Sequence, residues 1–281
     1  MRASKQLAPA AERVAPRSKQ LLLERRGRGA LLLTLARPER ANSLSHAMLK
    51  ALKAAIDGAA RAQDVRCVLI AGQGPVFCAG HDLKELTRHR GDGDGGVAHF
   101  EEVMRSCAAM MRSIIDCPKP VIAAVEGAAL AAGCQLVATC DLAVAAQAAS
   151  FCTPGVNIGL FCSTPMVALS RNVARKRAME MLLFGDQLEA GAAMEYGLVN
   201  RVVPAGRALA EALALAERIA AKPAATLAIG KAAFYKQIEM PLAAAYDYAA
   251  SVMVENMLHR EAAEGIGAFL EKRAPGWSKS A

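Results

Sequence analysis

The sequence is poor in aromatic residues and has no long uncharged apolar run. Phe, Trp and Tyr make up 4% of the 281 residues, with a single Trp, while 54% of the residues are hydrophobic. Aliphatic and alanine side chains must therefore fill the interior. No window reaches the roughly 18 consecutive apolar residues expected of a membrane-spanning helix, so we expect no membrane partner. The early segment also lacks the long apolar core of a signal peptide.

Paired cysteines of the C-x-x-C type are missing, although the chain has eight cysteines. Most of them lie in apolar runs, which is typical of small buried hydrophobes in a reducing compartment rather than of disulfides or zinc ligands. The sequence therefore predicts neither a disulfide framework nor a metal site. The eight are Cys67, Cys78, Cys107, Cys117, Cys134, Cys140, Cys152 and Cys162.

A basic stripe of the kind that binds a nucleic-acid duplex is also missing from most of the chain. Residues 1–28 carry eight basic and two acidic side chains, a balance of +6, which leaves only +2 of the total charge of +8 for the other residues. We therefore expect no nucleic-acid partner. Residues 1–18 are predicted to form a basic, flexible tail, while a basic start with few acidic residues is also compatible with an organelle transit segment.

The apolar pattern predicts β–α units first and helices last. Residues 20–38 contain two short apolar runs separated by Gly-Arg-Gly, which predicts a hairpin, and Ser45 is a candidate N-cap for the helix that follows. The run Val121–Val125 is continuously apolar, as expected for a strand in a sheet that is covered on both faces. We therefore predict an α/β fold with a core over residues 19–205 and a helical C-terminal region over residues 206–281.

Two segments rich in small residues stand where a strand is expected to run directly into a helix. They are "FCAGHDL" at Phe77–Leu83 and "LAAGCQL" at Leu130–Leu136. The first N–H groups of a helix have no intrahelical partner, the helix dipole adds partial positive charge there, and small side chains let a ligand oxygen approach the backbone. Each segment alone is more typical of close packing. Brought together, the two would make an oxyanion hole, a pair of amides aimed at one carbonyl oxygen.

The two segments belong to a longer ordered pattern. The stretches "RPERANSLS", "GPVFCAGHDLKEL", "KPVIAAVEGAALAAGCQLVATCDL", "FCTPGVNIGL", "AMEYGLVNRVV" and "EGIGAFLEKR" occur in this order. The pattern resembles the crotonase superfamily, also called the enoyl-CoA hydratase/isomerase family, over roughly residues 19–277. The resemblance implies a ClpP/crotonase-like spiral of ββα units, with C-terminal helices that build trimers or dimers of trimers.

The same resemblance implies an acyl-CoA thioester as the substrate. Coenzyme A is part of that substrate, so no separate cofactor is expected. A bacterial member of this kind is expected in the cytoplasm, and a eukaryotic member in the mitochondrial matrix.

The resemblance also assigns roles to particular residues. The two amide donors of the oxyanion hole correspond to the N–H groups of His81 and of Ala132, which stands where the family usually has the middle glycine of three. Alanine is a mild change there because only the N–H is needed. Lys272 matches a lysine that reaches a CoA phosphate from a neighbouring subunit, with an ordinary exposed charge as the alternative. The other expected substrate-binding residues are Arg40, Ala41, Asn42, Ala79, Gly80, Asp82, Leu83 and Gly133.

The chain departs from the family where a hydratase needs its acid and its base. Two glutamates supply these groups in the family, and the matching positions here hold Gln135 and Gly155. A glutamine amide can orient a water molecule but cannot exchange a proton near neutral pH, and glycine has no side chain. Since general acid–base catalysis contributes typically about 10²–10⁴-fold, we expect ordinary hydratase turnover to be poor.

Several side chains near the two turns have more than one possible role. The His81 imidazole could titrate near neutrality, in an "AGHD" pattern similar to that of the family's methylmalonyl-CoA decarboxylase, or it could pack on a loop so that only its amide matters. Asp82 is expected to cap the following helix, and Asp141 to organise the entry of a strand. Cys134 is either a thiolate favoured by a helix N-terminus or a small buried cysteine. The residues that follow the second lost glutamate and could line the same pocket are Asn157, Cys162 and Ser163.

Three functions are compatible with this sequence. The first is an acyl-CoA enzyme of fatty acid metabolism, of the lyase or isomerase class, that stabilises a thioester enolate and hydrates poorly. The second is another enolate reaction, such as decarboxylation or thioester hydrolysis, which His81→Ala would impair more than Gln135→Ala. The third is a protein that binds acyl-CoA without turnover.

Overall fold

A computed structural model describes residues 12–18 and 20–279 of the chain. Its strands are β1 (Glu12–Ser18), β2 (Leu21–Arg26), β3 (Ala30–Leu35), β4 (Cys67–Gly72), β5 (Val76–Cys78), β6 (Val121–Val125), β7 (Ala128–Leu130), β8 (Leu142–Ala146), β9 (Ser150–Cys152), β10 (Leu188–Glu189) and β11 (Arg201–Val203). Its α-helices are α1 (His46–Arg61), α2 (Leu83–His89), α3 (Val97–Asp116), α4 (Ala132–Thr139), α5 (Pro165–Asn172), α6 (Arg175–Phe184), α7 (Ala190–Glu195), α8 (Ala208–Ala220), α9 (Ala224–Gln237), α10 (Leu242–Leu258) and α11 (Arg260–Leu270). Short 3-10 helices are η1 (Pro38–Arg40), η2 (Pro154–Ile158) and η3 (Gly276–Lys279). No helix in these ranges is both long enough and apolar enough to cross a membrane.

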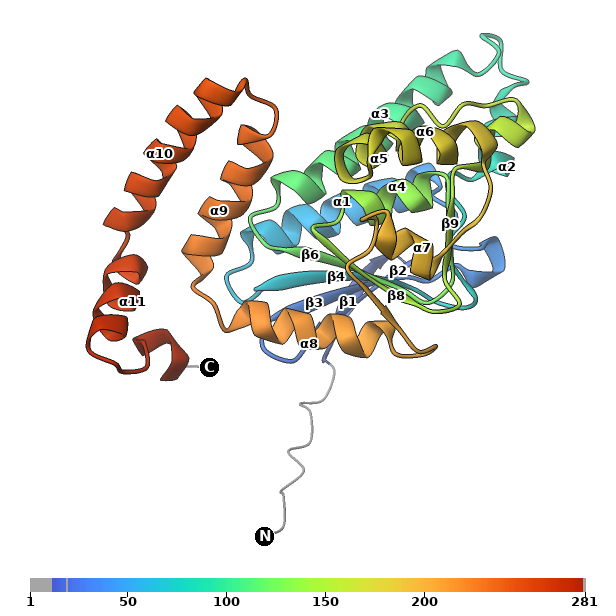
Figure 1. Ribbon diagram of the computed structural model, residues 1–281. Coiled ribbons are helices and arrows are strands. Elements are labelled where there is room, and N and C mark those ends of the chain that lie inside the picture. Colours follow the sequence, from blue (N-terminus) through green and yellow to red (C-terminus); the bar gives the residue numbers. More distant parts are fainter. Residues whose placement is uncertain (1–11, 19, 280–281) are drawn as a thin grey trace.

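The strands form two sheets, and β9 of the smaller sheet lies at one end of the larger sheet, across the direction of its strands (Figure 1). The larger sheet has the order β1-β2-β3-β4-β6-β8-β11, antiparallel from β1 to β3 and parallel from β3 onward. The smaller sheet has the order β10-β9-β7-β5, in which β5, β7 and β9 run parallel. The hairpin predicted over residues 20–38 is confirmed as β2 and β3, because each apolar run pairs with the other along its whole length.

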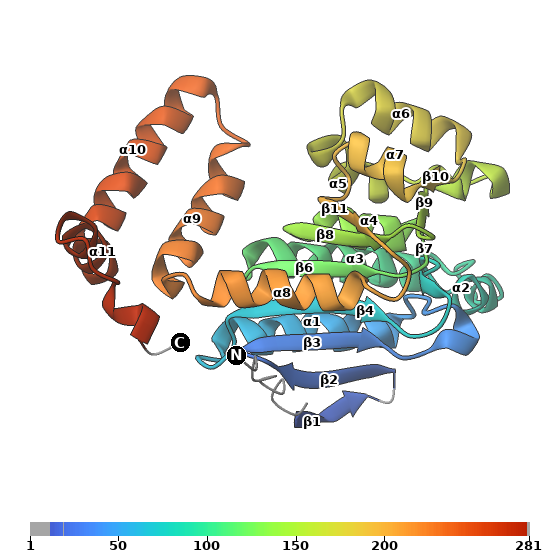
Figure 2. The same ribbon diagram turned by 60° about the horizontal axis from the view of Figure 1, so that its bottom comes forward.

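Both faces of the larger sheet are buried, and alternate residues of one strand serve the two faces. On β3, Leu33 belongs to the main hydrophobic cluster with residues of α1 and α3, such as Leu52 and Met110. Its neighbour Leu32 belongs to a second cluster, in which Leu215 of α8 covers the opposite face. Figure 2 shows α8 on one side of the sheet and α1 with α3 on the other. The continuous apolar runs in the sequence follow from this double coverage.

The N-terminal boundary of the sheet lies earlier than the sequence predicted. Residues 12–18, which we assigned to a flexible tail, form β1 and pair antiparallel with β2. The chain therefore enters the sheet before residue 19, because the backbone of β2 offers an edge on which a further strand can pair. The remainder of the predicted tail, residues 1–11, lies outside the described residues.

The predicted boundary at residue 206 separates α8 from the core to which it belongs. Ala212 and Leu215 of α8 are buried against the sheet. The Glu126 carboxylate, at the end of β6, accepts hydrogen bonds from the N–H groups of Gly206 and Ala208, at 2.8 and 2.7 Å. The helices that stand away from the core in Figures 1 and 2 are α9, α10 and α11.

A polar network joins these last helices to the core. Lys231 of α9 has a nearly buried ammonium, which donates to Asp141 Oδ2 at 2.7 Å and to the carbonyls of Ile114 and Lys119. Tyr235 donates its hydroxyl to the other oxygen of Asp141 at 2.9 Å. Asp141 Oδ2 also accepts from the N–H of Val121, the first residue of β6, at 2.7 Å. This bond confirms the prediction that Asp141 organises a strand entry.

Candidate active site

The two small-residue turns meet in the structure through Gly80. Gly80 has φ +90°, and a Cβ placed on it would lie 3.0 Å from the Leu130 carbonyl oxygen and 3.2 Å from the Ala132 nitrogen. The turn between β5 and α2 is therefore in direct contact with the turn between β7 and α4. Only glycine permits both this backbone conformation and this approach.

The two expected donors present free N–H groups at this contact. Leu44 pairs with the His81 segment through bonds from its N–H to Gly80 O and from the Asp82 N–H to its own carbonyl. This pairing uses the neighbours of His81, so the His81 N–H has no acceptor among the described residues. Ala132 is the first residue of α4, whose first internal bond runs from Gln135 N to Ala131 O. The Ala132 N–H is therefore one of the unpaired amides of a helix start.

Ala131 is held in a backbone conformation that is rare for alanine. Its φ is 49° and its ψ is −115°, a region normally left to glycine. Its N–H donates to the Cys152 carbonyl at 2.9 Å, which ties the turn to β9. Sequence reasoning did not select Ala131, although it occupies the place of the first glycine of the family's triplet. That match was the only signal in the sequence.

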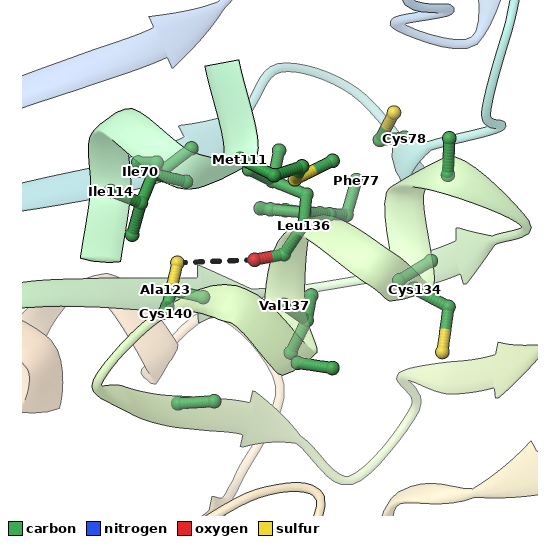
Figure 3. Close-up of a cluster of buried hydrophobic side chains, with 14 of the residues drawn as sticks. Ile70, Phe77, Cys78, Met111, Ile114, Ala123, Cys134, Leu136, Val137 and Cys140 are labelled. Carbon is green, nitrogen blue, oxygen red and sulfur yellow. Dashed lines mark hydrogen bonds between the residues drawn. The ribbon is translucent and has the colours of Figure 1, made fainter. Parts of the chain in front are cut away.

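Helix α4 is inserted into the core, and Gly133 makes this possible. A Cβ on Gly133 would lie 2.1 Å from the carbonyl oxygen of Cys78, at the end of β5. Figure 3 shows Cys134, Leu136 and Val137 of α4 among side chains from β4, β6 and α3, with a hydrogen bond from Cys140 Sγ to the Leu136 carbonyl. Every residue of α4 is buried. This packing fixes the direction in which the Ala132 N–H points.

Two buried polar atoms beside the turns have no hydrogen-bond partner in the described part of the chain. They are Oε1 of Gln135 and Nε2 of His81. Burial lowers the pKa of His81 from 6.5 to about 4, so its imidazole is neutral near pH 7. The expectation that this side chain titrates near neutrality is therefore wrong, because desolvation disfavours the charged form. Unpaired buried polar atoms are costly to a fold, and they mark where a ligand or water can bind.

At Gly155, which the resemblance matches to the second glutamate, the neighbouring backbone leaves no room for a side chain. Gly155 is buried in η2, and a Cβ on it would lie 2.3 Å from the Leu160 carbonyl oxygen and 2.9 Å from Cys162 Sγ. The Leu160 N–H in turn donates to the Gly155 carbonyl at 2.9 Å. A carboxylate could not be restored here by substitution alone, since the loop through Leu160 would have to move. Asn157 and Ser163 are exposed on either side of this loop.

The segment Arg40–Asn42 lies next to the first turn, because the Ala79 N–H donates to the Ala41 carbonyl at 3.0 Å. The Asn42 side chain is fully buried, and its amide donates to the carbonyls of Gln73 and Val76, both at 2.8 Å. Its oxygen accepts from the Arg37 N–H at 2.9 Å. The Asn42 side chain is thus occupied with the fold, while the exposed Arg40 remains free to reach a ligand.

Asp82 and Leu83 begin α2. The Asp82 carboxylate accepts from the N–H groups of Lys84 and Glu85 at 3.1 and 3.2 Å, which confirms its role as a helix cap. Leu83 is 48% exposed, so it can contact a ligand that enters the site from solvent.

The cysteines are all free and buried, as the sequence predicts. Burial raises the pKa of the Cys134 thiol, with smaller contributions from Cys152 and Cys162. The thiolate alternative for Cys134 is therefore wrong, because the apolar interior around α4 outweighs the helix dipole. No group of three or more metal-ligating side chains that could hold a metal ion occurs in the described ranges.

Lys272 follows α11, where it is exposed and has φ 51°. In both ribbon views α11 lies at the end of the molecule opposite α2 and β9. The fold does not bring Lys272 to the two turns of its own chain.

Comparison with known proteins places the chain in a family. It matches the family model described as Enoyl-CoA hydratase/isomerase over residues 25–280. It is 47% identical over 246 residues to the rat protein named Enoyl-CoA hydratase domain-containing protein 3, mitochondrial, covering 88% of this chain and 80% of the relative. It is 35% identical to Enoyl-CoA hydratase EchA19 of Mycobacterium tuberculosis, covering 91% and 95% of the two chains. The chain belongs to the enoyl-CoA hydratase/isomerase family.

Solved structures agree with this assignment. An enoyl-CoA hydratase from Mycobacterium smegmatis superposes with a TM-score of 0.87 at 49% identity, covering 92% of this chain and 99% of the other. Human enoyl Coenzyme A hydratase domain-containing protein 3 superposes with a TM-score of 0.86 at 45% identity, covering 92% and 100%. The predicted α/β fold of the crotonase type is thereby confirmed, and the chain is similar to the domain-containing protein 3 branch of the family.

Proposed function

We propose that the chain binds an acyl-CoA thioester and stabilises its enolate with the N–H groups of His81 and Ala132. The observation that carries the proposal is the contact at Gly80, which sets two unpartnered amides from different turns beside each other. Enolate formation places negative charge on the thioester oxygen, and preorganised donors lower the energy of that charge more than that of the ground state. Membership in the family supports the substrate class.

Hydration is the family reaction that this site supports least. Gln135 replaces one carboxylate with an amide that cannot exchange a proton near neutral pH. The second carboxylate has no room, because the Leu160 carbonyl faces Gly155. We expect crotonyl-CoA hydration far below that of a two-glutamate enzyme, by about 10²-fold or more. Turnover equal to such an enzyme would contradict this part of the proposal.

The oxyanion role can be tested without turnover by using acetoacetyl-CoA, whose enolate absorbs in the near ultraviolet. The bound ligand should show a larger enolate fraction than the free ligand at the same pH. Gly80→Ala would place a Cβ 3.2 Å from the Ala132 nitrogen and should remove this signal. Gly206→Ala is the matched control, because Gly206 also has a positive φ of 75° but faces open space. Ala132→Gly keeps the N–H and should keep the signal.

A second enolate reaction is favoured by the unpartnered Nε2 of His81. Decarboxylation of a malonyl-type thioester breaks the bond from Cα to the carboxylate, releases CO2 and leaves the electron pair as the enolate, so it needs no base. A neutral imidazole could orient the carboxylate before the bond breaks. Thioester hydrolysis, in which water adds to the carbonyl and gives a tetrahedral oxyanion rather than an enolate, is the other reaction that the two amides could support. For either reaction, His81→Ala should lower turnover more than Gln135→Ala, and the opposite ranking would reject this assignment. Tight acyl-CoA binding with no product would indicate a protein that binds without turnover.

The proposal includes assembly into a homotrimer or a dimer of trimers. The helices α9 to α11 expose large apolar side chains, among them Leu242 at 76%, Leu258 at 83% and Phe269 at 80%. Such a face costs free energy in water unless another surface covers it. Light scattering should give three or six chains, and Lys272→Ala should weaken acyl-CoA binding if the partner subunit supplies this lysine. A monomer at micromolar concentration would contradict the proposal.

The cellular compartment that we propose depends on the kind of organism from which the chain comes. The vertebrate relatives are named mitochondrial proteins. We propose the mitochondrial matrix if the source is a eukaryote and the cytoplasm if it is a bacterium.

A further inference from the structure

We propose a second ligand site, for a nucleoside phosphate, in a cavity between the core and the C-terminal helices. The cavity has a volume of about 480 Å³. Its walls come from the β2–β3 turn, the residue before β4, the α8–α9 junction, α11 and η3. The residues that carry the argument are Arg28, Arg66, Lys222, Pro223, Glu261 and Trp277.

Positive charge dominates the polar wall of this cavity. Arg28 and Lys222 are exposed, and in the described part of the chain neither side chain forms an ion pair. The Arg66 guanidinium is held in place, because it donates to the Lys222 carbonyl at 2.5 Å and its stem packs against Gly29. Two guanidinium groups and an ammonium around one space suit the oxygens of a phosphate.

The start of α9 adds to the positive electrostatic potential of the cavity. Pro223 precedes the helix, and no side chain caps the first N–H groups, beginning with Ala224. Pro223 and Ala224 both line the cavity. Free amides at the positive end of a helix dipole favour an anion, so they reinforce the three cations.

The remaining wall suits an aromatic base and a sugar. The Trp277 indole packs against α11 at Gly265, where an added Cβ would lie 2.8 Å from it. An indole face binds a base by stacking. Glu261 Oε2 is buried without a hydrogen-bond partner and lies 4.0 Å from His259 Nδ1, and a carboxylate there can accept from the amino group of a base or a ribose hydroxyl. The combination selects a nucleoside phosphate over free phosphate.

This cavity is separate from the oxyanion turns. Arg66 stands at the amino end of β4, whereas the turns containing His81 and Ala132 follow the carboxyl ends of β5 and β7. The six residues of β4 span roughly 20 Å. In Figure 2 the α8–α9 junction lies at the side of the molecule opposite β7 and β9.

The test is a calorimetric titration of the full chain with ADP. CoA itself carries an adenosine diphosphate group, so ADP can also enter the acyl-CoA site, and we expect two ADP per chain, of which the substitutions in the cavity remove one. Adenosine lacks the phosphates and inorganic diphosphate lacks the base, and each should bind at least about tenfold more weakly than ADP. A single ADP per unsubstituted chain that still binds in Arg28→Ser combined with Lys222→Ser would overturn the proposal, because that ADP would then occupy the acyl-CoA site.

Substitutions can test the phosphate-binding side and the base-binding side of the cavity independently. Arg28→Ser combined with Lys222→Ser should weaken ADP binding by about tenfold or more. Trp277→Leu should weaken ADP binding but leave diphosphate binding unchanged. Arg112→Ser removes an exposed cation from α3 and serves as the control, with no expected change. Equal ADP affinity in the control and in the double variant would overturn the proposal. The acetoacetyl-CoA enolate signal should persist in every variant, so failure here is distinct from failure of the oxyanion site.

Discussion

The two turns that meet at the candidate site are built by different means. The β5–α2 turn places its positive φ on Gly80, its helix is capped by the Asp82 side chain, and no residue of α2 is buried. The β7–α4 turn places its positive φ on Ala131, has no side-chain cap, and leads into a helix whose residues are all buried. Local hydrogen bonds hold the first turn, while packing holds the second. A free N–H can therefore be positioned either by hydrogen bonds within a loop or by packing in the hydrophobic core.

The largest effect is expected where packing holds the second turn. Gly133→Ala would place a Cβ 2.1 Å from the Cys78 carbonyl oxygen, so α4 would have to leave β5. We expect a loss of about 3 kcal/mol or more in the free energy of unfolding. Urea denaturation measures it. The control is Gly58→Ala in α1, which faces open space and should gain up to about 1 kcal/mol. Equal stability of the two variants would show that packing does not hold this turn.

A change of opposite sign is expected at Ala131, two residues earlier. Ala131→Gly should raise the free energy of unfolding by about 1 kcal/mol, because glycine adopts φ 49° and ψ −115° without the strain that alanine carries. Thermal unfolding measures the gain. The neighbouring Ala128→Gly in β7 should instead lose stability, since Ala128 is not among the residues with positive φ. Destabilisation by both variants would contradict the strain argument.

An effect of similar size is expected at the cap of the first turn. Asp82→Ala removes the acceptor of the Lys84 and Glu85 N–H groups and should cost about 1 kcal/mol. Asp82→Asn should retain most of the stability, because asparagine caps nearly as well. Hydrogen exchange of the first α2 amides reports the loss locally. Unchanged protection in Asp82→Ala would show that local bonds do not hold this turn.

The effect that is smallest at pH 7, and that grows only as the pH falls, is a pH dependence centred on His81. Burial holds the pKa of His81 at about 4 in the folded chain, against 6.5 for a solvated histidine. The unfolded chain therefore binds this proton first, and stability should fall as pH falls from 6.5 to 4, with no contribution above pH 6.5. His81→Gln should show a shallower slope over that window in urea unfolding. Identical slopes would contradict the depressed pKa.

Predictions that rest on neighbouring residues agree with the structure. Ser45 accepts a hydrogen bond from the Met48 N–H as an N-cap, and Asp82 caps α2 in the same way. The hairpin and the buried strand Val121–Val125 lie where the apolar runs predict them. These features depend on groups a few residues apart, so their physics is contained in a short stretch of chain.

Predictions failed or had no basis where distant residues meet. The closure of Gly155 by Leu160 depends on the path of a loop, and the depressed pKa of His81 depends on the packing around it. We placed the helix that follows residue 206 outside the core. The sequence shows that this helix has an apolar side, but not which face of the sheet that side covers. The strain at Ala131 had no basis in local preference, since alanine avoids that conformation.

The sequence by itself determined the small residues at the two turns, the caps and the apolar runs. It also holds Gln135 and Gly155 at the positions where the family resemblance led us to expect carboxylates. Only the tertiary structure decided that Gly80 abuts Ala132, that the His81 imidazole is neutral near pH 7, and that the Gly155 position is closed. The reason is physical. Conformational preference acts within about one helical turn of chain, whereas the contact between residues 80 and 132 exists because β5 and β7 pair in parallel and end at the same edge.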